Sequence, residues 1–228
     1  GIPTATLTGS LTDAGFEVND ALQSIYDGKS EEVSIDELSG AESSYTSFGD
    51  AAIVTIARGG SEGSDLKTHD APGNADTSKH VLELNDAEIE LVKYVKSKFD
   101  KVIVFINSAN VFELGELNAE KTEDNLGVDA ILWIGQVGND GATAIGRILN
   151  GTVDPSGHTV DTWERDFTKG PTYTNIGDLS QNFNADGSRS NNNLYVNGSV
   201  AYGADGETYH SVEYREGIYV GYRYYETM

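Results

Sequence analysis

Apolar residues of the chain gather into short runs between about residues 51 and 150. Mostly apolar segments stand at 51–57, 102–107 and 130–134, with polar or glycine-containing stretches between them. A strand that is buried on both faces is apolar throughout, as the strands of parallel sheets usually are. The pattern therefore predicts three strands of one buried sheet.

Between and after these runs, apolar residues recur at the spacing of an amphipathic helix. Asn85 stands three residues before Glu88, in the arrangement of a capping box, which predicts a helix near 86–98. A second helix is predicted near 140–150, with Gly151 just beyond its end. Strands that alternate with helices favour right-handed crossovers. The predicted fold class is α/β, a three-layer sandwich with a mostly parallel central sheet.

The N-terminal residues fit the same scheme with one strand lacking. Short helices are predicted at 7–14 and 21–26, with a strand at 16–18 between them. The chain opens directly on Gly1-Ile2-Pro3 and stops at Met228 just after a tyrosine-rich segment, so both ends are interpreted as cuts. No strand pattern precedes the first helix, so the first strand of the sheet is interpreted as missing. We expect residues 1–163 to form the sandwich domain.

After Trp163 the character of the sequence changes. Residues 164–211 are rich in Asn, Gly, Asp and Ser, which predicts a long irregular excursion, followed by a tyrosine-rich strand at 218–225. We expect 164–228 to pack on the sandwich domain. Residues 182–193 begin like a calcium-binding EF-hand loop, but Asn193 stands where the bidentate Glu belongs, so an Asn/Asp turn is favoured.

Composition narrows the choice of partners. The 37 acidic residues outnumber the 15 basic ones and give a net charge of −22, which repels phosphate backbones and anionic lipid. No nucleic-acid partner and no membrane insertion are expected, whereas a neutral sugar meets no repulsion. Cysteine is absent, and the four histidines show no metal-ligand spacing, so neither a cofactor nor a metal is predicted. The compartment stays undetermined.

The candidate chemistry lies in the loop after the first apolar run. Ligands of open α/β sheets bind beyond the carboxyl ends of the strands, and Glu62 and Asp65 are the carboxylates nearest that end. Glycines on both sides of Glu62 allow a sharp bend of the backbone. The alternative is that Glu62 is a solvent-exposed loop carboxylate with no chemical role. Asp65 either orients the loop or reaches the ligand, and Arg58 is either a partner for a site carboxylate or an ordinary surface residue. A dinucleotide site is rejected because the glycine spacing fits poorly.

Several short motifs in this region occur together in a known order. They begin with Arg58-Gly59-Gly60 and Glu62-Gly63-Ser64-Asp65 and continue through segments at 107–108, 113–115, 128–135, 148–151, 155–163 and 216–225. Each motif is weak alone, but the ordered set resembles the C-terminal α/β-sandwich domain of glycoside hydrolase family 3. Leu66 and Val137 depart from the common pattern and leave the substrate subgroup open.

The resemblance implies a two-domain retaining β-glycosidase, similar to β-glucosidases, that acts on a carbohydrate substrate. It implies that Glu62 is the general acid/base and that the nucleophilic aspartate lies on a TIM-barrel-like domain of the same parent protein, outside this chain. Arg58 and Asp65 are then candidates for substrate binding. The fragment alone is expected to be inactive. A non-catalytic carbohydrate-binding or scaffold domain is the alternative.

Overall fold

The computed structural model describes residues 4–29, 33–60, 66, 71–117, 126–172, 199–201, 208–210 and 216–227. Its central sheet contains three parallel strands, β1 (Ala52–Ala57), β2 (Val102–Asn107) and β3 (Ala130–Trp133), in the order β1-β2-β3. Ala52 is in register with Val102, and Ile103 with Ala130. The predicted parallel core is confirmed, with its strands within one residue of the expected ranges.

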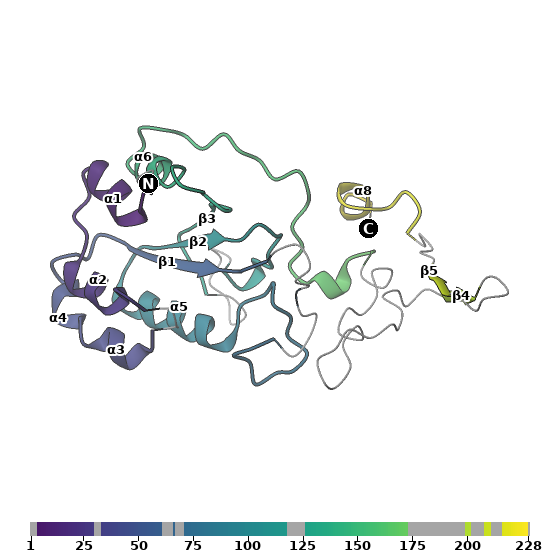
Figure 1. Ribbon diagram of the computed structural model, residues 1–228, viewed down its shortest axis with the longest axis horizontal. Coiled ribbons are helices and arrows are strands. Elements are labelled where there is room, and N and C mark those ends of the chain that lie inside the picture. The colour runs from purple at the N-terminus through teal and green to yellow at the C-terminus, as the bar shows by residue number, and fades with distance from the viewer. Residues whose placement is uncertain are drawn as a thin grey trace.

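Helices cover both faces of this sheet (Figure 1). Two helices, α1 and α6, lie together on one side, and α2 to α5 lie on the other. Their bounds are Leu7–Asp13 (α1), Asp20–Tyr26 (α2), Ile35–Ser39 (α3), Glu42–Tyr45 (α4), Asp86–Lys98 (α5) and Thr143–Leu149 (α6). Single 3₁₀ turns follow at Gly115–Leu117 (η1) and Phe167–Lys169 (η2). The three-layer α/β sandwich is therefore confirmed.

The main core lies between the sheet and α5. Alternate residues of β1 and β2 point to this face, where Val54, Ile56 and Val104 meet Val92 of α5. Phe112 and other residues of the loops at the end of the sheet complete the cluster. Burying one such side chain contributes about 1.5–3 kcal/mol, so this cluster stabilises the packing of α5 on the sheet.

Helix α5 begins where the capping box predicted it, because the Asn85 side chain accepts the Glu88 N–H and the Glu88 side chain accepts the Asn85 N–H. Helix α6 begins later than expected, at Thr143 rather than near residue 140. The Asn139 carbonyl accepts the N–H of Ala5, and the Gly141 N–H donates to Val137. These bonds hold residues before Thr143 in turns and delay the helix.

Two predicted strands are absent from the described structure. Residues 16–18 do not form a strand. The strand expected at 218–225 was wrong, because Tyr222–Tyr225 form one helical turn, α8. Gly221 precedes it with a φ of 55°, a conformation that interrupts an extended run and that glycine adopts readily.

The excursion predicted for 164–211 lies mostly outside the described residues, as does the EF-hand-like segment at 182–193. Its described part includes η2 and a short antiparallel pair, β4 (Ser199–Ala201) with β5 (Thr208–His210). Among the helices that the structure describes, none has the length and apolarity needed to cross a membrane.

Candidate functional site at the carboxyl edge of the sheet

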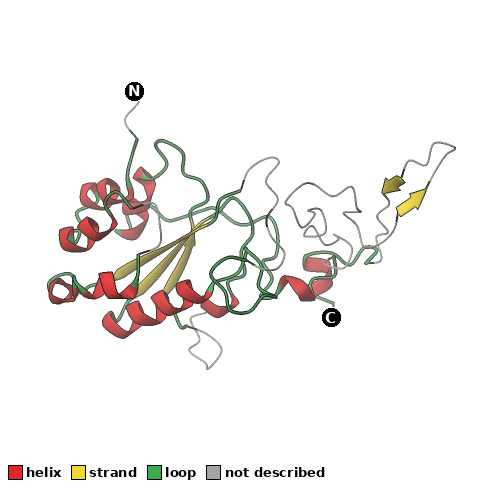
Figure 2. Cartoon of the chain, turned by 60° about the horizontal axis from the view of Figure 1, so that its bottom comes forward, coloured by secondary structure: helices red, strands yellow, loops and turns green. Residues whose placement is uncertain are grey.

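The three strands end at the same edge of the sheet, and their loops extend from it side by side (Figure 2). The Arg58 N–H donates to the Asn107 carbonyl at 3.0 Å, and the Ile134 N–H donates to the Ile106 carbonyl at 3.0 Å. These bonds continue the ladder past the ends of β1 and β3. The loops after β1, β2 and β3 therefore all begin at the same hydrogen-bonded edge of the sheet.

Glu62 and Asp65 lie outside the described residues, but the start of their loop is well defined. A Cβ atom placed on Gly60 would lie 3.1 Å from the Asn110 side-chain nitrogen, in the loop after β2. A larger residue at position 60 would push this neighbour away. The loop therefore leaves the sheet in close contact with the loop of the next strand, two residues before Glu62.

Arg58 is fixed by the protein itself. Its guanidinium makes a bidentate ion pair with Glu88, at 2.5 and 2.6 Å, and also donates to the carbonyls of Val81, Glu83 and Ala57. The Arg58 and Glu88 side chains are 11% and 10% exposed. A guanidinium has five N–H donors, and these five bonds use all of them. In this arrangement Arg58 has no donor left for a sugar.

The Arg58–Glu88 ion pair joins the two ends of the long loop between β1 and α5. Arg58 lies at the start of this loop, and Glu88 belongs to the first turn of α5, where its carboxylate also accepts the Asn85 N–H at 2.9 Å. The guanidinium also stacks over Phe112 of the core, 5.0 Å from the ring centroid. Sequence reasoning found the capping role of Glu88 but not this second role, because nothing local links residues 30 apart.

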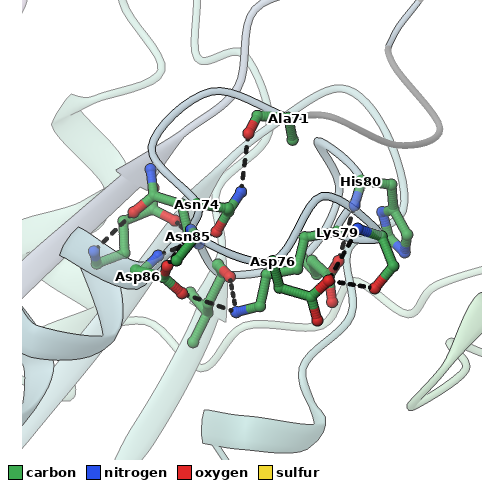
Figure 3. A network of polar contacts seen from close by, with 12 residues as sticks. Ala71, Asn74, Asp76, Lys79, His80, Asn85 and Asp86 are labelled. Carbon is green, nitrogen blue, oxygen red and sulfur yellow. Dashed lines mark hydrogen bonds and ion pairs between the residues drawn. The ribbon is translucent and has the colours of Figure 1, made fainter.

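The second half of the loop is held by its own polar network (Figure 3). The Asn74 side chain donates to the Ala71 carbonyl at 3.1 Å and accepts the Asp86 N–H at 3.1 Å. The Asp86 carboxylate accepts the Ala75 N–H at 2.7 Å. The Lys79 side chain donates to the Leu84 carbonyl, just before α5, at 3.0 Å. The loop that contains Glu62 therefore has two anchored ends.

A cluster of His80, Glu83 and Glu113 lies beside this network. Their ligand atoms are within 4.8 Å of one another, a grouping that the spacing of the histidines in the sequence did not reveal. His80 Nε2 lies 3.0 Å from Glu113, whose carboxylate also accepts the Phe167 N–H at 2.5 Å. The imidazole stacks on the Phe167 ring at 5.4 Å. The cluster thus ties the chain around η2 to the loop before α5.

The hydrogen bonds of His80 do not suit a metal ion. Its Nδ1 accepts the Leu82 N–H at 3.1 Å, so in the neutral form the proton is on Nε2 and faces Glu113. A metal on Nε2 would require the proton on Nδ1, where it would oppose the Leu82 N–H. Burial lowers the pKa of His80, but the hydrogen bond to Glu113 and the charges of Glu113, Glu83 and Asp166 raise that pKa above its ordinary value. The raised pKa favours the protonated imidazole beside Glu113.

Comparisons with known proteins agree with this architecture. The model of the family "Glycosyl hydrolase family 3 C-terminal domain" matches residues 4–222. Beta-glucosidase A of Butyrivibrio fibrisolvens is 29% identical over 194 residues, which are 79% of this chain and 19% of that protein. A beta-glucosidase of Ruminococcus albus is 26% identical over 144 residues, which are 63% of this chain and 11% of that protein.

A solved structure has the same fold. A beta-glucosidase from Paenibacillus barengoltzii aligns with a TM-score of 0.57 and 22% identity, and the alignment covers 77% of this chain and 20% of that one. The chain thus spans about a fifth or less of the length of these relatives. The family match covers nearly the whole sequence, and the chain belongs to glycosyl hydrolase family 3, as its C-terminal domain.

Proposed function

We propose that this domain supplies the general acid/base, Glu62, of a retaining β-glycosidase of the β-glucosidase type. The observation that carries the proposal is the family match over residues 4–222, together with the position of Glu62 in the sequence. Glu62 follows Gly60 by two residues in the loop that leaves the carboxyl end of β1, and open parallel sheets bind ligands beyond that edge.

The chemistry needs a second carboxylate from outside this chain. Retaining hydrolysis uses two carboxyl groups about 5–5.5 Å apart, one as nucleophile and one as acid and then base. The nucleophile belongs, on this proposal, to a barrel domain of the same parent protein. Glu62 first protonates the leaving oxygen of the sugar and then accepts a proton from the attacking water. The 228-residue chain alone is expected to be inactive, because it holds one carboxylate of the pair.

Arg58 acts in this scheme as a positioning residue. Its five hydrogen bonds join the start of the Glu62 loop to α5 and to the loop at 81–83. Asp65 remains a candidate for orienting the loop or reaching the sugar. We further propose that 1–163 is the sandwich domain and that 164–228 packs on it, which agrees with the contact between Phe167 and His80.

The test is Glu62→Gln in the full-length enzyme, with Asp65→Asn as the matched control. Loss of a general acid should slow cleavage of aryl β-glucosides with poor leaving groups by about 10²–10⁴-fold. Glycosylation by dinitrophenyl glucosides should be nearly unaffected, because this leaving group needs little protonation. The measurement is the pre-steady-state rate of aryl release for both substrates.

Equal losses on both substrates would mean that Glu62 only shapes the loop. Wild-type rates on both would contradict any catalytic role for Glu62 and favour the alternative, a carbohydrate-binding or scaffold domain. Asp65→Asn retains the Glu62 carboxyl group, so its loss on poor leaving groups should be much smaller than that of Glu62→Gln.

A further inference from the structure

A short turn at residues 80–83 supports Arg58. The Val81 and Glu83 carbonyls of this turn accept two of the five hydrogen bonds by which Arg58 holds the start of the Glu62 loop. Between them, the Leu82 carbonyl accepts the N–H of Glu113 at 2.8 Å. Whatever keeps the 80–83 turn in shape therefore also keeps the acceptors of Arg58 in place.

The side chain of His80 closes this turn. Its Nδ1 accepts the Leu82 N–H at 3.1 Å, a bond that Asp and Asn side chains make in turns with the N–H two residues on. The His80 side chain is 11% exposed, so little water can compete for this N–H. An Nδ1 that carries a proton is a donor and cannot accept the bond. The turn is therefore closed in this way only while His80 is neutral.

The other nitrogen of His80 faces the η2 segment, which we define as residues 166–170. Nε2 lies 3.0 Å from a Glu113 oxygen that also accepts the Phe167 N–H at 2.5 Å. The Phe167 ring stacks on the imidazole with 11° between the two planes. Protonation of His80 turns the Nε2 hydrogen bond into an ion pair, and charge-assisted hydrogen bonds are about twice as strong as neutral ones. The two ring nitrogens thus favour opposite protonation states.

Acidic groups surround the imidazole. Carboxylates of the turn, the loop after β2 and the η2 segment act on it: Glu83, Glu113 and Asp166. A further carboxylate, Glu116 of η1, acts on Glu83 and Glu113. The basic groups of the same region are paired with aspartates, Lys79 with Asp86 at 3.5 Å and Lys169 with Asp166 at 4.0 Å. A proton on His80 therefore lowers the negative charge of this cluster.

These charges set the pH at which His80 changes its protonation state. Burial lowers the pKa of His80, but the hydrogen bond to Glu113 and the three carboxylates raise that pKa above its ordinary value, about 6.5. The ion pair therefore contributes its full stability below about pH 6.5 and loses it as the pH rises through the folded pKa. The bond from Leu82 has the opposite dependence, because it requires the neutral ring.

We propose that His80 is a pH-dependent positioning residue for the Glu62 loop. When neutral, it closes the 80–83 turn that supports Arg58. When protonated, it gives up the bond from Leu82 for a stronger ion pair with Glu113, beside the η2 segment. A falling pH thus loosens the turn while it tightens the contact with η2. This exchange of contacts stands on the geometry of the domain, whereas its effect on catalysis rests on the proposed role of Glu62.

Amide hydrogen exchange tests the exchange of contacts in the 228-residue chain. With rates corrected for the pH dependence of intrinsic exchange, the protection of the Leu82 N–H should fall by about three- to tenfold as the pH falls through the midpoint of the His80 titration. The protection of the Phe167 N–H should rise by a similar factor over the same range. The midpoint is measured by NMR of the imidazole. Opposite changes at two amides separate this switch from a change in overall stability.

Two variants assign the response to this pair. His80→Asn keeps an acceptor for the Leu82 N–H but takes up no proton, so the pH dependence of both amides should vanish. Glu113→Gln keeps an acceptor for the Phe167 N–H but removes the charge, so the change at Leu82 should move to lower pH. His158→Gln is the matched control, because His158 is exposed and lies outside the cluster, and it should change neither response.

Three results would overturn the switch. They are constant protection of both amides, changes in the same direction at both, and an unaltered pH response in His80→Asn. If a variant does not fold, the two amides of the wild type still decide, because their opposite changes must share the midpoint of His80.

Kinetics of the full-length enzyme test the effect on Glu62. Below the His80 midpoint, His80→Asn should cleave aryl β-glucosides with poor leaving groups with a kcat about three- to tenfold above the wild type and a similar KM, because its turn stays closed. In the Glu62→Gln background this advantage should disappear, since the turn acts through Glu62. An advantage that persists there would overturn the positioning role. Wild-type rates for Glu62→Gln alone would instead overturn the proposed function, with the result on the two amides unaffected.

Discussion

The two edges of β1 differ in whether a described strand pairs with them. Towards β2 and α5, the strand is paired along its length, and the loop that leaves it is closed by the Arg58–Glu88 pair. On the other edge, no strand among the described residues pairs with β1, and Phe16 and Tyr26, which line a cavity there, are 40% and 42% exposed. The apparatus that holds the start of the Glu62 loop therefore lies within the described residues, whereas among the described strands none pairs with the other edge of β1.

The largest effect is expected on the side of β1 that faces β2 and α5. Arg58→Met leaves the Glu88 carboxylate buried without its counterion, which typically costs 3–5 kcal/mol, roughly the range for a broken buried ion pair. Urea unfolding measures the loss, and the double variant Arg58→Met with Glu88→Gln should recover part of it. Lys29→Met, which removes the exposed pair with Glu37, is the control and should leave the midpoint unchanged. A loss below about 1 kcal/mol for Arg58→Met would contradict the buried role.

A smaller effect is expected where α1 packs on α6. A Cβ atom on Gly146 would lie 2.0 Å from the Ser10 carbonyl oxygen, so Gly146→Ala should force the helices apart and cost about 1–3 kcal/mol. Gly157→Ala is the matched control, because a Cβ there meets nothing within 4 Å, and it should change stability by less than about 0.5 kcal/mol. Equal melting temperatures for the two variants would show that α1 is not tightly docked.

The smallest effect concerns Asp129, which accepts the Val102 N–H at 2.8 Å and pairs with Lys96 at 3.2 Å. The backbone hydrogen bond from Val102, followed by the one from Lys96, holds the pKa of Asp129 below its ordinary value. A lowered carboxyl pKa stabilises the fold above the unfolded pKa, about 3.9, and this stability is lost as the pH falls through the folded pKa.

Asp129→Asn should therefore destabilise the protein at pH 7 by less than about 1 kcal/mol, since the side chains of Asp129 and Lys96 are both accessible to solvent. The difference from the wild type should shrink as the pH falls below about 4. Thermal unfolding of both proteins across this pH range measures it. A difference that grows towards low pH would contradict the sign of the shift.

The local patterns of the sequence predicted the sheet and its main helix. Their continuous apolar runs identified β1 and β2 within one residue, although β1 is buried only at Val54 and Ile56 and its Thr55 and Ala57 are exposed. The Asn85–Glu88 capping box fixed the start of α5 because both bonds are local. The strand predicted at 218–225 failed because the apolar pattern does not show that Gly221 turns the backbone.

The site was only partly predictable. The motif around Glu62 and its family resemblance could be read directly, whereas the partners of Arg58 could not, since Glu88 is 30 residues away and pairs with it through the fold. His80 and Glu113 are 33 residues apart, and only the tertiary structure brings them within hydrogen-bonding distance. Long-range polar pairs leave no periodic signal in a single sequence.

The most direct test of the central claim, that Glu62 is the acid/base of the full-length enzyme, is azide rescue of Glu62→Ala. Azide attacks the glycosyl-enzyme intermediate without a general base, so it bypasses the step in which Glu62 would activate water. With dinitrophenyl β-glucoside as substrate, added azide should restore turnover by at least about tenfold and yield β-glucosyl azide, whereas the wild type should show little change. Unchanged turnover, with no glycosyl azide formed, would contradict the assignment.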